Sequence, residues 1–331
     1  MLYRAVRPIL FRCDPESAHD AALSAASRLA RRPGWCVSMR RRLARPREEP
    51  VRLLGLEFPT RIGLAAGFDK NALAPMAWWA VGFGFIELGT ITPLPQPGHP
   101  RPRMFRLPHE RALVNRMGFN NDGAAAVAGR LAAQRDVGLR PPIPIWISIG
   151  KNAVTAPERA ADDYAAAASA LGPHADLLTL NISSPNTEGL RSLQAAESVS
   201  RLVEAVRAAA PQRPVLVKVA PELDEPQLSA AAEAALSAGA SGLIATNTRS
   251  TESRPELPRG GLSGLPLRET ALRRVTTLRR RVGDRAVLVG CGGIDDRGSA
   301  RAMRDAGADL VQLYTALIYR GPFVAARLSH A

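Results

Sequence analysis

The sequence predicts an α/β fold, a closed (β/α)8 barrel (TIM barrel) with a small N-terminal helical extension. Short apolar runs recur at regular spacing, and stretches with helical spacing separate most of them. The length of 331 residues suits one such barrel with an appendage. We therefore expect the chain to divide into residues 1–46, the extension, and residues 47–331, the barrel.

Helices are predicted in the first 46 residues. Asp14 followed by Pro15 is a typical helix start, and alanines and Leu29 follow at helical spacing. Residues 2–10 form a second, shorter apolar face, and arginines surround both faces. Two interpretations stay open, namely a basic amphipathic pair lying on an anionic membrane and a helical cap packed on the barrel.

Eight apolar runs are predicted to be the barrel strands. Continuous rather than alternating apolar residues are typical of buried parallel strands. The runs are 61–67, 85–90, 143–150, 177–183, 215–220, 242–248, 286–293 and 310–316, and helices are predicted at 158–171, 195–210, 225–238, 268–282 and 297–306. The alternative is a doubly wound open sheet, which would call for a GxGxxG turn after the first strand. The motif AGFDKN (66–71) is not such a turn.

Composition excludes some classes of function. The net charge of +14 is compatible with anionic lipid, nucleic acid or small anions as partners. Only 5% of residues are aromatic, without a basic and aromatic stripe, which argues against nucleic-acid binding. The three cysteines lack CxxC spacing and the five histidines lack ligand spacing, so no metal site is predicted. No apolar run reaches the roughly 18 residues of a membrane span.

The chain has only three lysines against 41 arginines. Lys70 and Lys151 follow the first and third predicted strands, and Lys218 lies within the fifth. Most asparagines also fall at strand ends. Chemistry in a barrel collects at the carboxyl ends of its strands, so these residues are the first candidates for a site.

Three clusters of amide side chains mark the predicted barrel mouth. They lie in LNISSPNTEGLR (180–191), NRMGFNN (115–121) and ATNT (245–248). Asparagine both donates and accepts hydrogen bonds, so such clusters can hold a planar, amide-rich ligand. A polar loop with ordinary Ser and Asn turns is the alternative.

Lys218 is a charge inside an otherwise apolar strand, VLVKVA. It could be a Schiff-base nucleophile of a lyase, or a fixed cation beside a reduced flavin. Gly-rich turns at 260–264 and 289–294 could cradle a phosphate. Cys291, among these glycines, reads as a small filler.

Nine motifs in order resemble dihydroorotate dehydrogenases: AAGFDKN, ELGTITPLPQPGHPRPRMFRL, NRMGFNN, IGKN, NISSPNTEGLR, KVAP, ATNT, GGLSG and QLYT. The resemblance runs over nearly the whole chain. It implies an FMN-containing barrel that oxidises dihydroorotate to orotate in pyrimidine synthesis. Ser184, where the family's other class has Cys, and the helical extension are typical of the quinone-linked class 2.

The resemblance also implies roles for individual residues. Ser184 is the expected base, Thr187 the candidate relay partner, and Lys218 the cation that stabilises flavin charge. The expected substrate-binding residues are Lys70, Asn115, Arg116, Met117, Gly118, Phe119, Asn181, Asn186, Asn247 and Thr248. The expected FMN-binding residues are Ala66, Gly67, Phe68, Asp69, Lys70, Thr90, Ser148, Asn181, Lys218, Thr246, Gly264, Gly293, Tyr314 and Thr315.

The resemblance implies, further, that residues 1–46 form a membrane-bound access route for a ubiquinone-type quinone, with His19 and Tyr314 along it. The expected location is peripheral, on the cytoplasmic face of the cell membrane. Ser148 departs from the pattern, because the family usually has Asn there to help hold the flavin. We expect slightly weaker FMN binding as a result.

Overall fold

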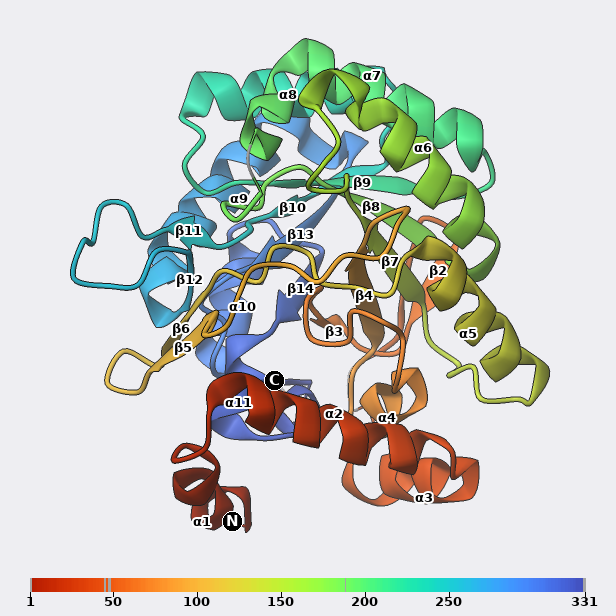
Figure 1. Cartoon of the computed structure of the whole chain (residues 1–331), viewed down its shortest axis with the longest axis vertical. Helices are drawn as coiled ribbons and strands as arrows, with labels where there is room; N and C mark the ends of the chain where they lie inside the picture. The colour runs from red at the N-terminus through yellow and green to blue at the C-terminus, as the bar shows by residue number, and fades with distance from the viewer. Residues whose placement is uncertain (1, 45, 47–48, 188, 330–331) are drawn as a thin grey trace.

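Eight parallel strands close into a barrel at the centre of the computed structural model (Figure 1). The structure describes residues 2–44, 46, 49–187 and 189–329. The barrel strands are β3 (Ile62–Leu64), β4 (Phe85–Ile91), β7 (Ile145–Ile149), β8 (Leu177–Asn181), β9 (Val215–Val219), β10 (Gly242–Ala245), β13 (Val287–Cys291) and β14 (Leu310–Leu313). Each strand pairs with the next along the chain, and β14 pairs with β3. The predicted barrel is confirmed, and the open-sheet alternative is wrong.

Helices surround the barrel and follow its strands. They are α4 (Pro75–Ala80), α5 (Ala124–Asp136), α6 (Ala160–Leu171), α7 (Ala196–Ala209), α8 (Glu225–Ser237), α9 (Arg268–Val282), α10 (Arg297–Asp305), α11 (Thr315–Arg320) and α12 (Val324–Leu328). Short 3₁₀ turns lie at Pro157–Arg159, Gly172–His174, Leu190–Gln194, Leu265–Leu267 and Gly283–Arg285. Capping side chains fix where some of these helices begin. Asp224 and Asp296 each cap their helix through a reciprocal capping box.

A hairpin closes the amino-terminal end of the barrel. Its strands are β1 (Val51–Leu53) and β2 (Leu56–Phe58). Phe58 is fully buried and packs edge-on against Phe85 and Trp146, which point into the barrel. The apolar cluster around Phe58 therefore fills the lower half of the barrel interior.

Polar side chains replace this apolar cluster two residues further along the same strands. Side chains alternate along a strand, so residues two apart share a face. We call this set the polar layer: Glu87, Ser148, Thr179, Lys218, Cys291 and Gln312, which follow Phe85, Trp146, Leu177, Leu216, Val289 and Leu310. The barrel interior thus changes from apolar to polar toward its carboxyl end.

A second, antiparallel sheet lies beside the barrel mouth in the order β11-β12-β6-β5 (Figure 1). Its strands are β5 (Met104–Leu107), β6 (Ala112–Asn115), β11 (Arg249–Ser250) and β12 (Gly261–Gly264). They belong to the connections that follow β4 and β10. The sequence analysis did not predict this sheet or the β1–β2 hairpin.

The N-terminal helices are α1 (Leu2–Leu10), α2 (Pro15–Ala30) and α3 (Pro33–Leu43). Asp14 caps α2 by accepting a hydrogen bond from the Ser17 amide, 2.8 Å away, as the sequence predicts. α2 and α3 pack against α4, and α2 also contacts β5. The predicted division at residues 46 and 47 falls where residues 45, 47 and 48 lie outside the described part of the chain.

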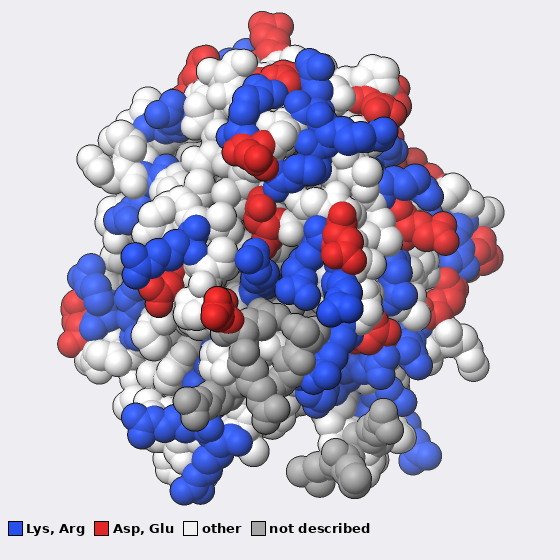
Figure 2. All heavy atoms as spheres, turned by 180° about the vertical axis from the view of Figure 1, so that it is seen from behind, with Lys and Arg blue, Asp and Glu red and all other residues white. Residues whose placement is uncertain are grey.

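The face turned away from the viewer in Figure 1 carries basic and acidic side chains interspersed (Figure 2). Lys and Arg spread over much of this face instead of gathering into one patch. Within the described residues, none of the helices is both long and apolar enough to cross a bilayer.

Candidate active site

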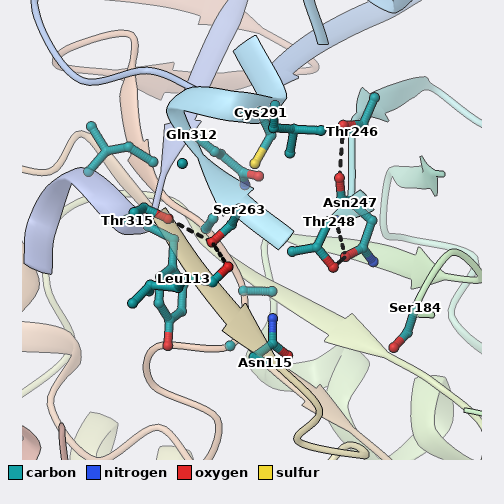
Figure 3. Close-up of a pocket in the computed structure, with 18 of the residues that line it drawn as sticks. Leu113, Asn115, Ser184, Thr246, Asn247, Thr248, Ser263, Cys291, Gln312 and Thr315 are labelled. Carbon is teal, nitrogen blue, oxygen red and sulfur yellow. Dashed lines mark hydrogen bonds between the residues drawn. The ribbon is translucent and has the colours of Figure 1, made fainter. Parts of the chain in front are cut away.

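A pocket opens at the carboxyl ends of the barrel strands, above the polar layer (Figure 3). Side chains from distant parts of the chain line it. Those that the sequence predicted are Ala66, Gly67, Lys70, Thr90, Asn115, Met117, Gly118, Phe119, Asn181, Ser184, Asn186, Lys218, Thr246, Asn247, Thr248, Gly264, Gly293, Tyr314 and Thr315. The fold therefore brings most of the candidate substrate-binding and FMN-binding residues to one space.

Phe68 and Asp69 are not among the lining residues, although both were expected in the FMN shell. The Asp69 carboxylate is fully buried and accepts hydrogen bonds from the Leu73 and Ala74 amides and from Trp78 Nε1, at 2.7–2.9 Å. Phe68 packs edge-on against Trp78. Both side chains thus hold the turn that carries Lys70.

Arg116, Ser148 and Thr187 also lie outside the lining. The Arg116 guanidinium donates to the Pro102 carbonyl, on the outer side of its loop. The Ser148 hydroxyl is buried in the polar layer, 2.9 Å from the Thr90 hydroxyl. Thr187 is buried, and its carbonyl accepts a hydrogen bond from the Leu190 amide. Ser148 therefore reaches the pocket through Thr90.

The predicted amide clusters hold one another in place. Asn181 Nδ2 donates to Thr90 Oγ1 at 2.7 Å, and Asn247 Nδ2 donates to Asn181 Oδ1 at 3.1 Å. On the other side of the pocket, Asn186 Nδ2 donates to the carbonyl of Asn115 at 3.0 Å. These bonds leave other amide donors and acceptors of the pocket available to a ligand.

Ser184 lies at one edge of the pocket, with Ser263 and Thr315 at the other (Figure 3). It is 6% exposed. Its Oγ accepts a hydrogen bond from the Asn186 amide at 3.2 Å. That bond orients the hydroxyl in a turn directly after β8.

Lys218 lies at the pocket floor and forms a buried ion pair with Glu87, with 3.3 Å between Nζ and Oε2. Burial is the largest single influence and works to lower the pKa of Lys218, but the charge and hydrogen bond of Glu87, together with the nearby Cys291 sulfur, raise that pKa above its usual value. Lys218 is therefore a cation in the folded protein. A charged amine is not a nucleophile, which disfavours the Schiff-base interpretation.

Lys70 lies at the opposite side, toward the N-terminal helices. Burial is the main cause that lowers its pKa to about 8, although the carboxylate of Glu16 opposes this. On α2, burial lowers the pKa of His19 to about 3, so this imidazole is neutral at physiological pH. Its ring packs on Phe68, with 4.8 Å between the ring centroids.

Gly-rich backbone forms the remaining wall, as the sequence predicted. Gly264, Gly292 and Gly293 adopt positive φ angles of 95°, 126° and 70°. A Cβ on Gly293 would lie 2.4 Å from Arg268 Cα, and one on Gly264 would lie 2.3 Å from the Arg111 carbonyl oxygen. Only glycine lets these segments lie so close, and backbone amides of such turns at a pocket wall suit a phosphate.

Sequence reasoning missed several lining residues. They are Ala65, Met104, Arg111, Leu113, Leu265, Leu267, Asp295, Gln312, Leu313 and Ala316. Ser263, Cys291, Gly292 and Ile294 also line the pocket and belong to the Gly-rich turns that the sequence singled out. Gln312 is fully buried, and neither polar atom of its amide has a partner within the described structure. A lone polar residue in the apolar run LVQLYT was the available signal, the same one that singled out Lys218. Its amide suits a polar ligand.

The residues present therefore fit a planar, polar group with a phosphate. Asn181, Gln312 and Lys218 offer donors, an acceptor and a positive charge, and the glycine turns offer backbone amides. Within the described residues, His, Cys, Asp and Glu form no group of three or more that could hold a metal ion. Burial raises the pKa of the Cys291 thiol, which keeps it neutral.

Comparison with known proteins identifies the family of this chain. Residues 50–331 match the family model described as "Dihydroorotate dehydrogenase". The chain is 45% identical to a dihydroorotate dehydrogenase (quinone) of Leptothrix cholodnii, covering 97% of this chain and 95% of the relative. It is 48% identical to the protein of the same name from Thermobifida fusca, covering 97% and 89%.

A solved structure supports the same assignment. The crystal structure of DHODH from Eimeria tenella in complex with ferulenol superposes with a TM-score of 0.85 at 35% identity, covering 96% of this chain and 90% of that chain. The family resemblance predicted from the sequence is confirmed: the chain belongs to the dihydroorotate dehydrogenase family.

Proposed function

We propose that the protein oxidises (S)-dihydroorotate to orotate in de novo pyrimidine synthesis, with FMN as hydride acceptor and a ubiquinone-type quinone as final electron acceptor. One observation carries this proposal. A serine hydroxyl, paired asparagine amides and a buried cation from distant parts of the chain line one pocket at the barrel mouth. The names of the relatives, which specify dihydroorotate and quinone, support the substrates.

FMN, when bound, would supply a two-electron acceptor for the hydride. Gly264, Gly293 and Thr315 would hold its phosphate, and Thr90, Asn181 and Lys218 its ring. Ser184 would remove the proton from C5 of dihydroorotate while the hydride leaves C6. The amides of Asn115, Asn186 and Asn247 would orient the planar substrate, and Lys70 would attract its carboxylate.

Ser184 needs help in this role, because a serine hydroxyl is a weak base. Thr187 follows three residues later and is the candidate partner in a proton relay. Both residues lie in the connection after β8, and Ser184 and Thr187 are 6% and 9% exposed. Limited access of water favours transfer along such a relay.

We also propose that residues 1–46 carry the protein to the cytoplasmic face of the cell membrane as a peripheral protein. Val6, Ile9, Trp35 and Leu43, all in the N-terminal helices, are 40%, 64%, 66% and 59% exposed. Arginines flank these side chains, so the surface combines apolar area with positive charge.

The quinone would reach the pocket between these helices and the barrel. His19, Phe68 and Tyr314 form a chain of edge-on aromatic contacts, with ring centroids 4.8 and 5.3 Å apart. Tyr314 also lines the pocket. Aromatic side chains along the proposed route would suit an uncharged quinone ring.

The test is an anaerobic visible spectrum of the purified protein. We expect a flavin band that bleaches when dihydroorotate is added, that orotate does not bleach, and that a soluble quinone analogue restores after bleaching. Absence of the band, or a band that dihydroorotate leaves oxidised, would refute the proposal. In that case, borohydride trapping of Lys218 with carbonyl substrates would test the lyase interpretation.

A further inference from the structure

Glu87 is a buried carboxylate directly below the pocket. It belongs to the polar layer and is 0% exposed. Unlike Lys218, it is not among the residues that line the pocket. Glu87 therefore makes no direct contact with a ligand in the pocket.

Two contacts define the surroundings of Glu87. Its Oε2 accepts hydrogen bonds from Lys218 Nζ at 3.3 Å and from the backbone amide of Ala66 at 3.2 Å. Its Oε1 is buried without a hydrogen-bond partner in the described structure. Both neighbours of Oε2 line the pocket, so the carboxylate ties two parts of the pocket floor together.

A charge in such a place is costly unless it is paired. Isolated buried ammonium groups lose their proton, and documented buried lysines have pKa values of about 5–6. The Glu87 carboxylate reverses this for Lys218, whose pKa lies above its usual value. Among the neighbouring side chains of the polar layer, Gln312 has no charge, and Cys291 raises the pKa of Lys218 less than Glu87 does.

We propose that Glu87 is a positioning residue, whose carboxylate holds Lys218 as a fixed cation at the pocket floor and thereby sets how strongly the pocket stabilises negative charge on the flavin. The inference rests on the proposed function, because it takes FMN as the ligand. Hydride transfer brings two electrons and one proton, and so adds one negative charge to the ring. A fixed cation stabilises that product more than the neutral oxidised ring.

The experiment compares Glu87→Gln with Glu233→Gln, both loaded with FMN. Glu233 on α8 pairs with Arg281 and Arg285 outside the barrel, so its substitution also removes one carboxylate from an ion-pair network. The two-electron reduction potential is measured by dye equilibration at about pH 8, above the pKa documented for unpaired buried lysines. The dissociation constant for sulfite, which forms an anionic adduct with flavin, is a second readout.

We expect Glu87→Gln to weaken sulfite binding at least tenfold, and to lower the potential by about 30 mV for each tenfold loss. Glu233→Gln should change neither value. An unchanged or raised potential in Glu87→Gln would show that Lys218 keeps its charge unaided, and would overturn the inference.

A second comparison starts from Lys218→Met, which has no cation for Glu87 to hold, and so separates the positioning role from a packing role. If Glu87→Gln alone folds poorly, the double variant Glu87→Gln with Lys218→Met buries no unpaired charge and can be compared instead. Adding Glu87→Gln to Lys218→Met should not lower the potential further. An equal decrease in both backgrounds would overturn the inference. These measurements need no dihydroorotate. If the protein binds FMN but dihydroorotate does not bleach the flavin band, only the proposed function is refuted. If the protein binds no FMN, both the proposed function and the role of Glu87 are refuted.

Discussion

The reactivity of Ser184 depends on groups around it, because its hydroxyl has no intrinsic tendency to ionise near neutral pH. It receives a hydrogen bond from the Asn186 amide and is shielded from water. These features orient the oxygen and would protect the proposed proton relay. The chemistry of this residue is therefore a property of the whole connection after β8.

Replacing Ser184 with Ala should slow dihydroorotate-driven bleaching of the flavin by about 10²–10⁴-fold, the usual contribution of a general base. The oxidised flavin spectrum should stay unchanged, because Ser184 is not expected to hold FMN. Anaerobic stopped-flow absorbance measures the rate. Ser192→Ala, an exposed hydroxyl on the same connection, is the control and should retain the full rate.

Lys70 should make orotate binding depend on pH. Burial lowers its pKa to about 8, so the side chain is a cation below that pH and neutral above it. We expect the affinity for the orotate anion to decline as pH rises through about 8, as titrations of the flavin spectrum would show. Lys70→Arg stays charged, and its affinity should be flat over the same range. A wild-type affinity that is also flat would contradict this role.

The composition of the site was predictable, but the direction of each side chain was not. Lys70, Lys218 and the clustered asparagines identified the pocket because they stood out at strand ends, whereas Lys151, the third lysine, does not line it. Arg116 and Asp69 lie beside the pocket in sequence yet point away from it, toward backbone partners that only the folded loops provide. Leu113 was missed because it belongs to a sheet whose strands have only two to four residues each.

At the scale of elements, α2 is held to the barrel by a buried ion pair. Arg103 Nη2 lies 2.7 Å from Glu16 Oε1, and their side chains are 9% and 5% exposed. Arg103 also donates to two backbone carbonyls. The extension is therefore fixed to the connection after β4, next to the pocket.

Glu16→Ala should lower the free energy of unfolding by about 3–5 kcal/mol, because it leaves Arg103 buried and unpaired. Asp20→Ala removes a pair with Arg101 whose side chains are 56% and 57% exposed, and should cost less than about 1 kcal/mol. Urea denaturation measures both.

The same ion pair has a pH dependence. Burial works to raise the pKa of Glu16, but Arg103 and Arg101 outweigh it and lower that pKa. The stabilisation is therefore complete above the usual carboxyl pKa and is lost as pH falls through the lowered value. The difference in the free energy of unfolding between wild type and Glu16→Ala should therefore become smaller at acidic pH.

The exposed apolar side chains of the extension should control membrane binding. Ile9→Ser with Trp35→Ser should reduce partitioning to phosphatidylglycerol-containing vesicles at least tenfold, because about 25 cal/mol per Å² of buried apolar area is lost. Val137→Ser with Val154→Ser removes side chains that are 69% and 91% exposed elsewhere, and serves as the control. Equal loss in both pairs in a sedimentation assay would contradict a specific membrane face.

The strands were predictable because each is a continuous apolar run, yet several predicted strands extend beyond the observed ones. The runs 61–67, 242–248 and 310–316 contain strands of only three or four residues. Their last residues leave the ladder to line the pocket. Apolar content alone cannot show where pairing stops and the site begins.

On the scale of the whole molecule, the β1–β2 hairpin closes the amino-terminal end of the barrel, and Phe58 packs into the barrel interior there. Phe58→Ala should lower the free energy of unfolding by about 3–5 kcal/mol, since a fully buried aromatic ring is removed. Val154→Ala, at a 91% exposed position, should change it by less than about 0.5 kcal/mol. Urea denaturation of FMN-saturated samples measures both. Similar values for the two variants would show that the hairpin does not contribute to the core.

The placement of the three lysines determines which amine of the protein reacts with an acylating reagent. Lys151 and Lys218 are almost fully buried, and Lys70 lines the pocket. Apart from the chain's terminal amine, an activated ester would therefore find its most accessible side-chain amine inside the ligand site. The lowered pKa of Lys70, about 8, also leaves more of that amine in its reactive neutral form. Mass-spectrometric labelling of a single peptide would then report ligand occupancy without relying on colour or turnover.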